Sequence, residues 1–137
     1  MTIPLANLTL MTGLIGMGKS SAIQSLLVLR QSFQQGLFPD RGLALNGDLI
    51  SLGTAKAVLF EYAQRDEIGI AMTYGHSDRV SDFLFRYDQQ ADTLGVLEKS
   101  IGIDFLEQNV FTDRFQYIQA ERLGPRVMFP VSDHFVR

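Results

Sequence analysis

The chain has no cysteine among its 137 residues, which excludes a disulfide framework and a metal site built from thiolates. It also has no strong excess of one charge, because 12 Lys and Arg stand against 15 Asp and Glu. The basic residues are scattered along the chain, so a broad electrostatic surface for nucleic acid is not indicated. The two histidines, His76 and His134, lie far apart in the sequence, and neither has a metal-ligand pattern beside it.

Long hydrophobic runs and targeting signals are missing as well. The apolar run at residues 22–29 is interrupted by Gln24 and Ser25 and is much shorter than the roughly 20 residues that span a bilayer. Residues 1–11 lack the basic residues that begin a secretory signal peptide. The composition, 46% apolar and 20% charged, is typical of a folded globular domain. We therefore expect one soluble, cytoplasmic domain with no membrane partner.

A strand, a glycine-rich loop and a helix are predicted in succession at residues 8–35. Residues 8–12 are short, apolar and β-branched at intervals, as expected of a strand buried on both faces of a parallel sheet. From Lys19 to about Gln35, apolar residues recur every three or four positions, which predicts a helix with one broad apolar face. Gly36 and Pro39 then predict its end.

The rest of the chain is predicted to be rich in β-structure, from residue 43 to residue 119. Asn46-Gly47 is a strong turn signal between two apolar segments, and residues 55–64 favour a short helix. Alternating patterns predict further strands at residues 68–74, 82–87, 92–98 and 115–119. The expected fold class is α/β: a phosphate-loop strand–loop–helix unit, a mostly antiparallel β meander, and a C-terminal segment at residues 120–137.

The loop between strand and helix carries the clearest chemical signal. Gly13, Gly18, Lys19 and Ser20 match the spacing of a Walker A phosphate loop. Glycines allow turns that a Cβ would forbid, and consecutive N–H groups at a helix start form a nest for anions. Lysine supplies a charge to the β- and γ-phosphates, and the serine hydroxyl is suited to ligate Mg²⁺. The alternative is a glycine-rich turn with a solvated lysine.

We therefore expect ATP with Mg²⁺ as the bound cofactor. Lys19 is the expected catalytic cation, Ser20 the expected magnesium ligand, and Ser21 a donor to the α-phosphate. The residues expected to surround the nucleotide are Gly13, Leu14, Ile15, Gly16, Met17, Gly18, Lys19, Ser20 and Ser21.

Residues 13–33 resemble the ATP-binding heads of ABC-type ATPases of the SMC-like and OLD-like kind, within the P-loop NTPase superfamily. Those heads usually carry Gly-Pro-Asn-Gly-Ser-Gly-Lys-Ser-Ser, followed by an apolar helix that ends near Leu-Arg-Gln-Ser. Residues 45–53 and 117–126 extend the resemblance to a bacterial subgroup of AAA ATPases, some of which occur in anti-phage systems. The similarity runs in order along nearly the whole chain.

The departures from the family pattern bear on hydrolysis. Leu14, Ile15 and Met17 stand where the family usually has Pro, Asn and Ser, so a polar side chain near the γ-phosphate is replaced by Ile15. Family members also continue to a signature loop, a Walker B strand ending in Asp-Glu, and a switch histidine. No apolar run followed by Asp-Glu occurs here, because Asp66-Glu67 follows polar residues. The chain therefore looks like the N-terminal lobe of an ATPase head, whether split, remnant or truncated.

The resemblance also implies roles near residue 119. A glutamine at a strand end in such heads reaches Mg²⁺ and the attacking water, and Gln119 is the best match by position, with Gln116 behind it. An ordinary polar residue at a strand end is the alternative. Arg122 and Arg126 are candidates for contact with nucleotide, a partner head or DNA phosphate, or they are surface arginines.

Two functional hypotheses follow. In the first, the chain is the ATP- and Mg²⁺-binding half of an ABC-type head and hydrolyses ATP only when a partner supplies the Walker B and signature motifs. A second head, DNA or a nuclease effector would then be partners by family analogy alone. In the second, it is a non-hydrolysing nucleotide-binding or structural interaction module that needs a partner to cover its exposed apolar surface.

Overall fold

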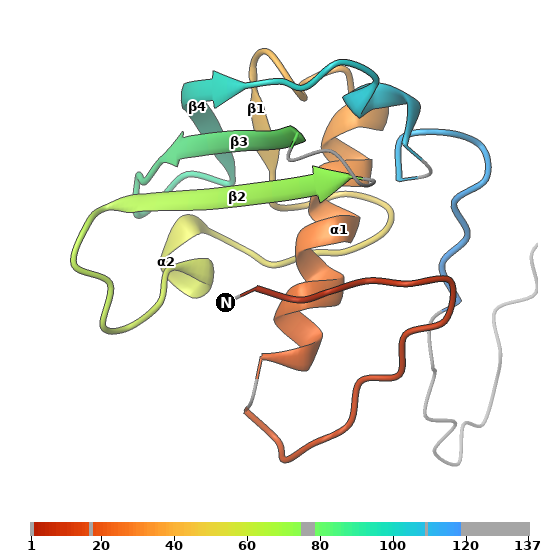
Figure 1. Ribbon diagram of the computed structural model, residues 1–137. Helices are drawn as coiled ribbons and strands as arrows, with labels where there is room; N and C mark the ends of the chain where they lie inside the picture. Colours follow the sequence, from red (N-terminus) through yellow and green to blue (C-terminus); the bar gives the residue numbers. More distant parts are fainter. Residues whose placement is uncertain (1, 17, 75–78, 109, 119–137) are drawn as a thin grey trace, which may run out of the picture.

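The computed structural model describes residues 2–16, 18–74, 79–108 and 110–118 (Figure 1). Helix α1 (Lys19–Gln34) is followed by strand β1 (Gly42–Ala44), the short helix α2 (Ala55–Val58) and strand β2 (Glu67–Tyr74). Strands β3 (Arg79–Arg86) and β4 (Thr93–Ser100) come next, and then one 3-10 turn, η1 (Phe105–Glu107). The architecture is α/β, with one long helix against one antiparallel sheet.

The sheet has four strands in the order β1-β4-β3-β2, and every neighbouring pair is antiparallel. β2 and β3 pair without interruption from Glu67–Arg86 to Tyr74–Arg79. The pairing of β3 with β4 shifts by one residue between Leu84 and Phe85. Such a bulge increases the local twist, and the sheet curls around α1 in Figure 1.

Helix α1 packs its C-terminal half on the concave face of the sheet (Figure 1). Val28 and Leu29 are buried there against Phe83 and Phe85 of β3 and Leu94 of β4, in one apolar core. The helix ends where the sequence predicts, because Gly36 adopts φ 70°, a left-handed conformation that suits a residue just beyond a helix end. The N-terminal half of α1 extends beyond the sheet.

Phenylalanines close the core on the side of the 3-10 turn. The ring of Phe38 stacks on that of Phe111 with centroids 5.6 Å apart and lies 4.7 Å from that of Phe83. Phe105 lies 5.0 Å from Phe111 and 5.1 Å from Phe83. These rings come from four separate segments, so their contacts join the segment after β4 to the helix and the sheet.

Two buried polar side chains of α1 bind β1 and the loop that follows it. Gln31 Nε2 donates to Ala44 O at 2.8 Å, and Gln31 Oε1 accepts from the N–H of Ile50 at 3.1 Å. The Ser32 hydroxyl accepts from the N–H of Ala44 at 2.7 Å. Each bond satisfies main-chain groups that burial would otherwise leave unpaired, so these side chains fix the register between helix and strand.

Gln31→Ala is expected to lower the free energy of unfolding by about 1–3 kcal/mol, because it leaves the buried carbonyl of Ala44 without this donor. Urea unfolding followed by circular dichroism measures the change. Gln34→Ala, at an exposed position of the same helix, is the matched control and should change stability by less than about 0.5 kcal/mol. Equal effects of the two substitutions would contradict the assigned role of Gln31.

Most predicted elements are confirmed. The helix after the glycine-rich loop and the strands predicted at 68–74, 82–87 and 92–98 correspond to α1, β2, β3 and β4. The Asn46-Gly47 turn lies in a hairpin-like loop closed by an antiparallel bridge between Asn46 and Ser51. The turn predicted at residues 75–78 lies outside the described residues.

The strand predicted at residues 8–12 is wrong. These residues form no strand, and the side chains of Leu8 and Leu10 are 89% and 85% exposed. A strand needs a neighbouring strand to pair its main-chain hydrogen bonds, and the four strands of the described sheet pair only with one another. The loop and helix therefore lack the preceding strand that a phosphate-loop unit usually has.

Two further predictions need correction. The strand predicted at residues 115–119 is wrong for 115–118, which form no strand, and the described strands end at Ser100. The helix predicted at 55–64 is only the four residues of α2, because Leu59 is already extended. Beyond it, Phe60 and Tyr62 stay exposed and contact each other instead of the core. In the described part of the chain, no helix has the length and apolarity to cross a bilayer.

Candidate functional site

The glycine-rich loop turns sharply into α1. Gly13, Gly16 and Gly18 have φ values of 139°, 88° and 80°, in the region that disfavours residues with a Cβ. Residues 13–16 are exposed to solvent, so a ligand can reach their main chain. The three glycines are therefore at positions where the backbone requires them, as the spacing predicts.

Lys19 folds back over this loop. Its Nζ donates to the carbonyl of Gly13 at 2.8 Å and to that of Leu14 at 2.5 Å. The side chain thus reaches residues five and six positions earlier and places its positive charge inside the curve of the loop. The ammonium group therefore lies against the main chain of the glycine-rich loop.

The N-terminus of α1 is open to an anion. Gly18 is the N-cap, no side chain caps the helix, and its first turn contains no acidic residue. The first intrahelical bond runs from the N–H of Ala22 to the carbonyl of Gly18 at 3.1 Å, so the N–H groups of Lys19, Ser20 and Ser21 precede the helical ladder. With 16 residues, the helix is long enough for its dipole to favour negative charge at this end.

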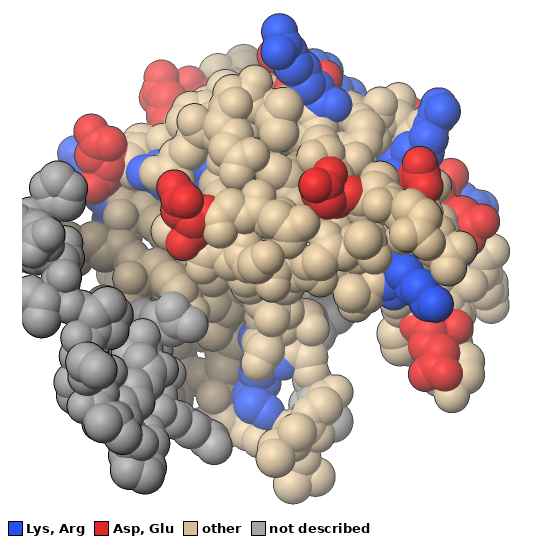
Figure 2. Space-filling model, turned by 180° about the vertical axis from the view of Figure 1, so that it is seen from behind, with Lys and Arg blue, Asp and Glu red and all other residues tan. Residues whose placement is uncertain are grey.

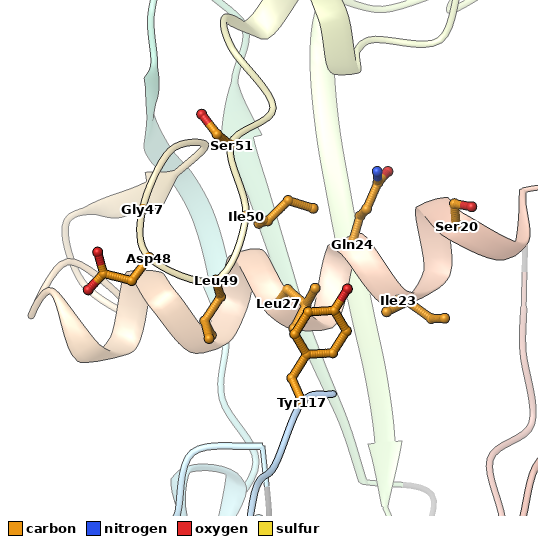
Figure 3. Close-up of a pocket in the computed structure, with 10 residues that line it drawn as sticks. All are labelled: Ser20, Ile23, Gln24, Leu27, Gly47, Asp48, Leu49, Ile50, Ser51 and Tyr117. Carbon is orange, nitrogen blue, oxygen red and sulfur yellow. The ribbon is translucent and has the colours of Figure 1, made fainter. Parts of the chain in front are cut away.

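A groove of about 580 Å³ begins at Ser20 and follows one face of α1 (Figure 3). Ser20, Ile23, Gln24 and Leu27 form its floor at helical spacing. Its other lining residues are Gly47, Asp48, Leu49, Ile50, Ser51 and Tyr117. The groove and the glycine-rich loop therefore share Ser20.

One wall of the groove is a loop held rigidly by hydrogen bonds. Asn46 Oδ1 accepts from the hydroxyl of Ser51 and from the N–H of Gly53, each at 2.9 Å. Gln31 binds the N–H of Ile50, as described above. A Cβ on Gly47 would lie 2.6 Å from Gln35 Nε2 and 2.9 Å from Gln31 Oε1, so a larger residue there would require these side chains to shift.

The opposite wall is Tyr117, which approaches α1 from the other side in Figure 3. The preceding residues are fixed to the helix by Arg30, whose Nη1 donates to Val110 O at 3.1 Å. The Arg30 guanidinium also lies 5.6 Å from the ring centroid of Phe115. Arg30 is only 8% exposed, so these contacts compensate a nearly buried charge.

A magnesium ion could take only part of its shell from the described residues. The Ser20 hydroxyl is one suitable oxygen ligand, and Mg²⁺ commonly takes its remaining ligands from phosphates and water. Within the described ranges, no three His, Cys, Asp or Glu side chains are grouped to hold a metal ion. The Ser20 hydroxyl would therefore supply one ligand to a magnesium ion that arrives with a nucleotide.

Charges of both signs lie on the surface of the described residues. On the face drawn in Figure 2, Lys and Arg side chains are interspersed with Asp and Glu.

Several predicted site residues belong to parts of the chain that the structure does not describe. Met17, Gln119, Arg122 and Arg126 lie outside the described residues, as do both histidines. Gln116 is exposed and does not line the groove.

Sequence reasoning missed the groove. Its lining residues 47–51 lie within the stretch 45–53 that resembles the ATPase family, but nothing in the sequence indicated that this stretch would face Ser20. Comparison of this chain with protein-family models, curated proteins and solved structures found no match.

Proposed function

We propose that this chain binds ATP with Mg²⁺ through residues 13–21. The observation that carries the proposal is the position of Lys19 Nζ, which bonds to two carbonyls of the glycine-rich loop. The three glycines of this loop have positive φ angles, and the helix that follows has no side-chain cap. A polyphosphate needs a main chain turned by glycines, N–H groups outside the helical ladder and a nearby cation, and all three occur together here.

The same contacts explain how a ligand could enter. The loop is exposed, so the bonds of Lys19 to the Gly13 and Leu14 carbonyls compete with water and contribute little net free energy. A phosphate oxygen offers the ammonium group a stronger, charge-assisted partner. Lys19 is expected to exchange these carbonyls for phosphate oxygens when ATP binds.

Hydrolysis, in this proposal, requires a second polypeptide. An attacking water must be oriented and the Mg²⁺ shell completed, which phosphate-loop ATPases achieve with a carboxylate. Among the described residues that line the groove, Asp48 is the one acidic residue, and in Figure 3 it lies at the opposite end from Ser20. This arrangement supports the interpretation of the chain as the N-terminal half of an ABC-type head, which a partner completes with Walker B and signature motifs.

The experiment is to measure ATP binding and phosphate release on the isolated chain. With saturating Mg²⁺ and ATP, we expect binding in a calorimetric titration and no phosphate release above background. Sustained release by the verified chain would contradict the proposed need for a partner carboxylate, while absence of binding would contradict the proposed function itself. The Lys19→Ala variant, purified in the same way, controls for a contaminating ATPase.

A further inference from the structure

The groove along α1 differs in electrostatic character between its two ends. Ser20 stands at one end, next to Lys19 and the N-terminus of the helix, both of which attract anions. Asp48 stands at the other end in Figure 3, and its carboxylate repels anions. A ligand that lies along the groove is therefore favoured with its anionic part at Ser20 and an uncharged part beyond it.

Between these ends the groove is lined mainly by apolar side chains. They come from α1, from the loop after β1 and from the C-terminal side of η1: Ile23, Leu27, Leu49, Ile50 and Tyr117. In Figure 3 the Tyr117 ring lies beside Leu27, about midway between Ser20 and Asp48. Gln24 and Ser51 add an amide and a hydroxyl to this lining. An apolar recess with a few polar groups is the usual composition of a site for a small molecule, and about 580 Å³ lies within the roughly 300–1,000 Å³ of such sites.

We propose that this groove binds the ribose and the adenine ring of the ATP whose phosphates the glycine-rich loop holds, an inference that rests on the proposed function. The order of the lining residues matches the order of the groups in the nucleotide. Gln24 lies one helical turn beyond Ser20, where its amide can donate to and accept from the ribose hydroxyls. Leu27 lies about 10 Å beyond Ser20 along the helix axis, since each residue adds about 1.5 Å, and a ribose with its base spans a comparable length.

Tyr117 is the expected stacking partner of the base. Aromatic side chains stack on the faces of bases, and Tyr117 is 40% exposed, so part of its surface is open to a ligand. The wall across the groove is already in place, because the N–H of Ile50 donates to Gln31 Oε1 at 3.1 Å. The adenine ring would therefore lie between the tyrosine ring and this loop, with Leu27 beneath it.

The test compares ATP with inorganic tripolyphosphate, each titrated calorimetrically with Mg²⁺ against the whole chain. Tripolyphosphate carries at least as much negative charge as ATP and lacks the nucleoside, so tighter binding of ATP measures the contribution of the groove. Tyr117→Ala is expected to weaken ATP binding at least ~10-fold, in the range of base–aromatic stacking. The same variant should bind tripolyphosphate as the parent does, which also shows that it is folded. Tyr117→Phe keeps the ring and should bind ATP nearly as the parent does.

Tyr62→Ala is the matched control, because the same side chain is removed from a position that is 75% exposed and does not line the groove. It should bind both ligands with the affinity of the parent. The groove assignment is overturned, with phosphate binding by the loop left intact, if the parent binds ATP no more tightly than tripolyphosphate. It is also overturned if Tyr117→Ala changes the affinity for ATP no more than the affinity for tripolyphosphate. A parent that binds neither ligand would overturn the proposed function and this inference with it.

Discussion

Lys19→Ala is expected to weaken ATP binding by about 100-fold, or to abolish it at accessible concentrations. Hydrogen bonds to charged groups contribute about 1.5–3 kcal/mol each, and the ammonium group can make more than one to the phosphates, so a loss near 3 kcal/mol is expected. The substitution also removes the bonds from Nζ to the carbonyls of Gly13 and Leu14, which contribute little net free energy because they are exposed. A fluorescent ATP analogue titrated in the presence of Mg²⁺ measures the change.

Lys56→Ala is the matched control for that experiment. Lys56 is exposed on α2, far from the loop in the sequence, and it is preferable to Lys99, which forms an ion pair with Asp40. The control removes the same charge from the chain, so any general electrostatic attraction of the nucleotide falls equally in both variants. If the two variants bind the analogue with the same affinity, the phosphate-loop assignment is wrong.

Phe85→Ala is expected to lower the free energy of unfolding by about 3–5 kcal/mol. Phe85 is fully buried in β3, next to the bulge between Leu84 and Phe85, and its ring stacks on that of Phe83 with centroids 6.4 Å apart. Truncation removes the apolar contact between the sheet and the helix at the centre of the core and leaves a cavity behind. For a domain of this size, such a loss is a large share of the total stability.

Chemical denaturation of the parent and the variant gives this difference directly. Phe60→Ala serves as the control, because the same side chain is removed from a position that is 69% exposed. We expect the control to change stability by less than about 1 kcal/mol, and mostly through its ring contact with Tyr62. A comparable loss in both variants would contradict the position of Phe85 in the core.

The elements that could be predicted from sequence are those whose apolar residues are buried, or whose strands are paired, by other parts of this chain. Helix α1 has a buried face because the sheet covers it, and the alternation in β2, β3 and β4 matches strands that find one another in a meander. Leu8 and Leu10 have an equally clear strand pattern but no strand beside them, so they remain exposed. The hydrophobic pattern of a segment indicates which element it can form, whereas the strands and helices beside it decide whether that element forms.

Residues 115–118 illustrate a different limit. Their alternation of apolar and polar residues favours a strand, but they form none, and the Arg30 guanidinium of α1 lies over the ring of Phe115. The buried charge of Arg30 requires the carbonyl of Val110 and the aromatic ring, and this requirement orients the segment. Such a long-range polar contact leaves no periodic trace in the sequence.

Of the candidate site, the phosphate loop could be predicted from the sequence, but the groove could not. The phosphate loop is local, and its glycines and lysine are recognised from spacing within eight residues. The groove beside it combines residues 47–51 with Tyr117 on the face of α1 that carries Ser20. These segments lie far apart in the sequence, and the hydrogen bond from Ile50 to Gln31 brings one of them to the helix. Only the fold reveals this arrangement.

Amide chemical-shift mapping with ATP and Mg²⁺ tests the central claim most directly. Main-chain N–H groups that bind phosphate should show the largest changes, and we expect these at Gly13, Gly16, Gly18, Lys19 and Ser20, with inorganic tripolyphosphate producing a similar pattern. Unchanged resonances in this loop at saturating ATP, or changes confined to other parts of the chain, would contradict the claim that it binds the phosphates of a nucleotide.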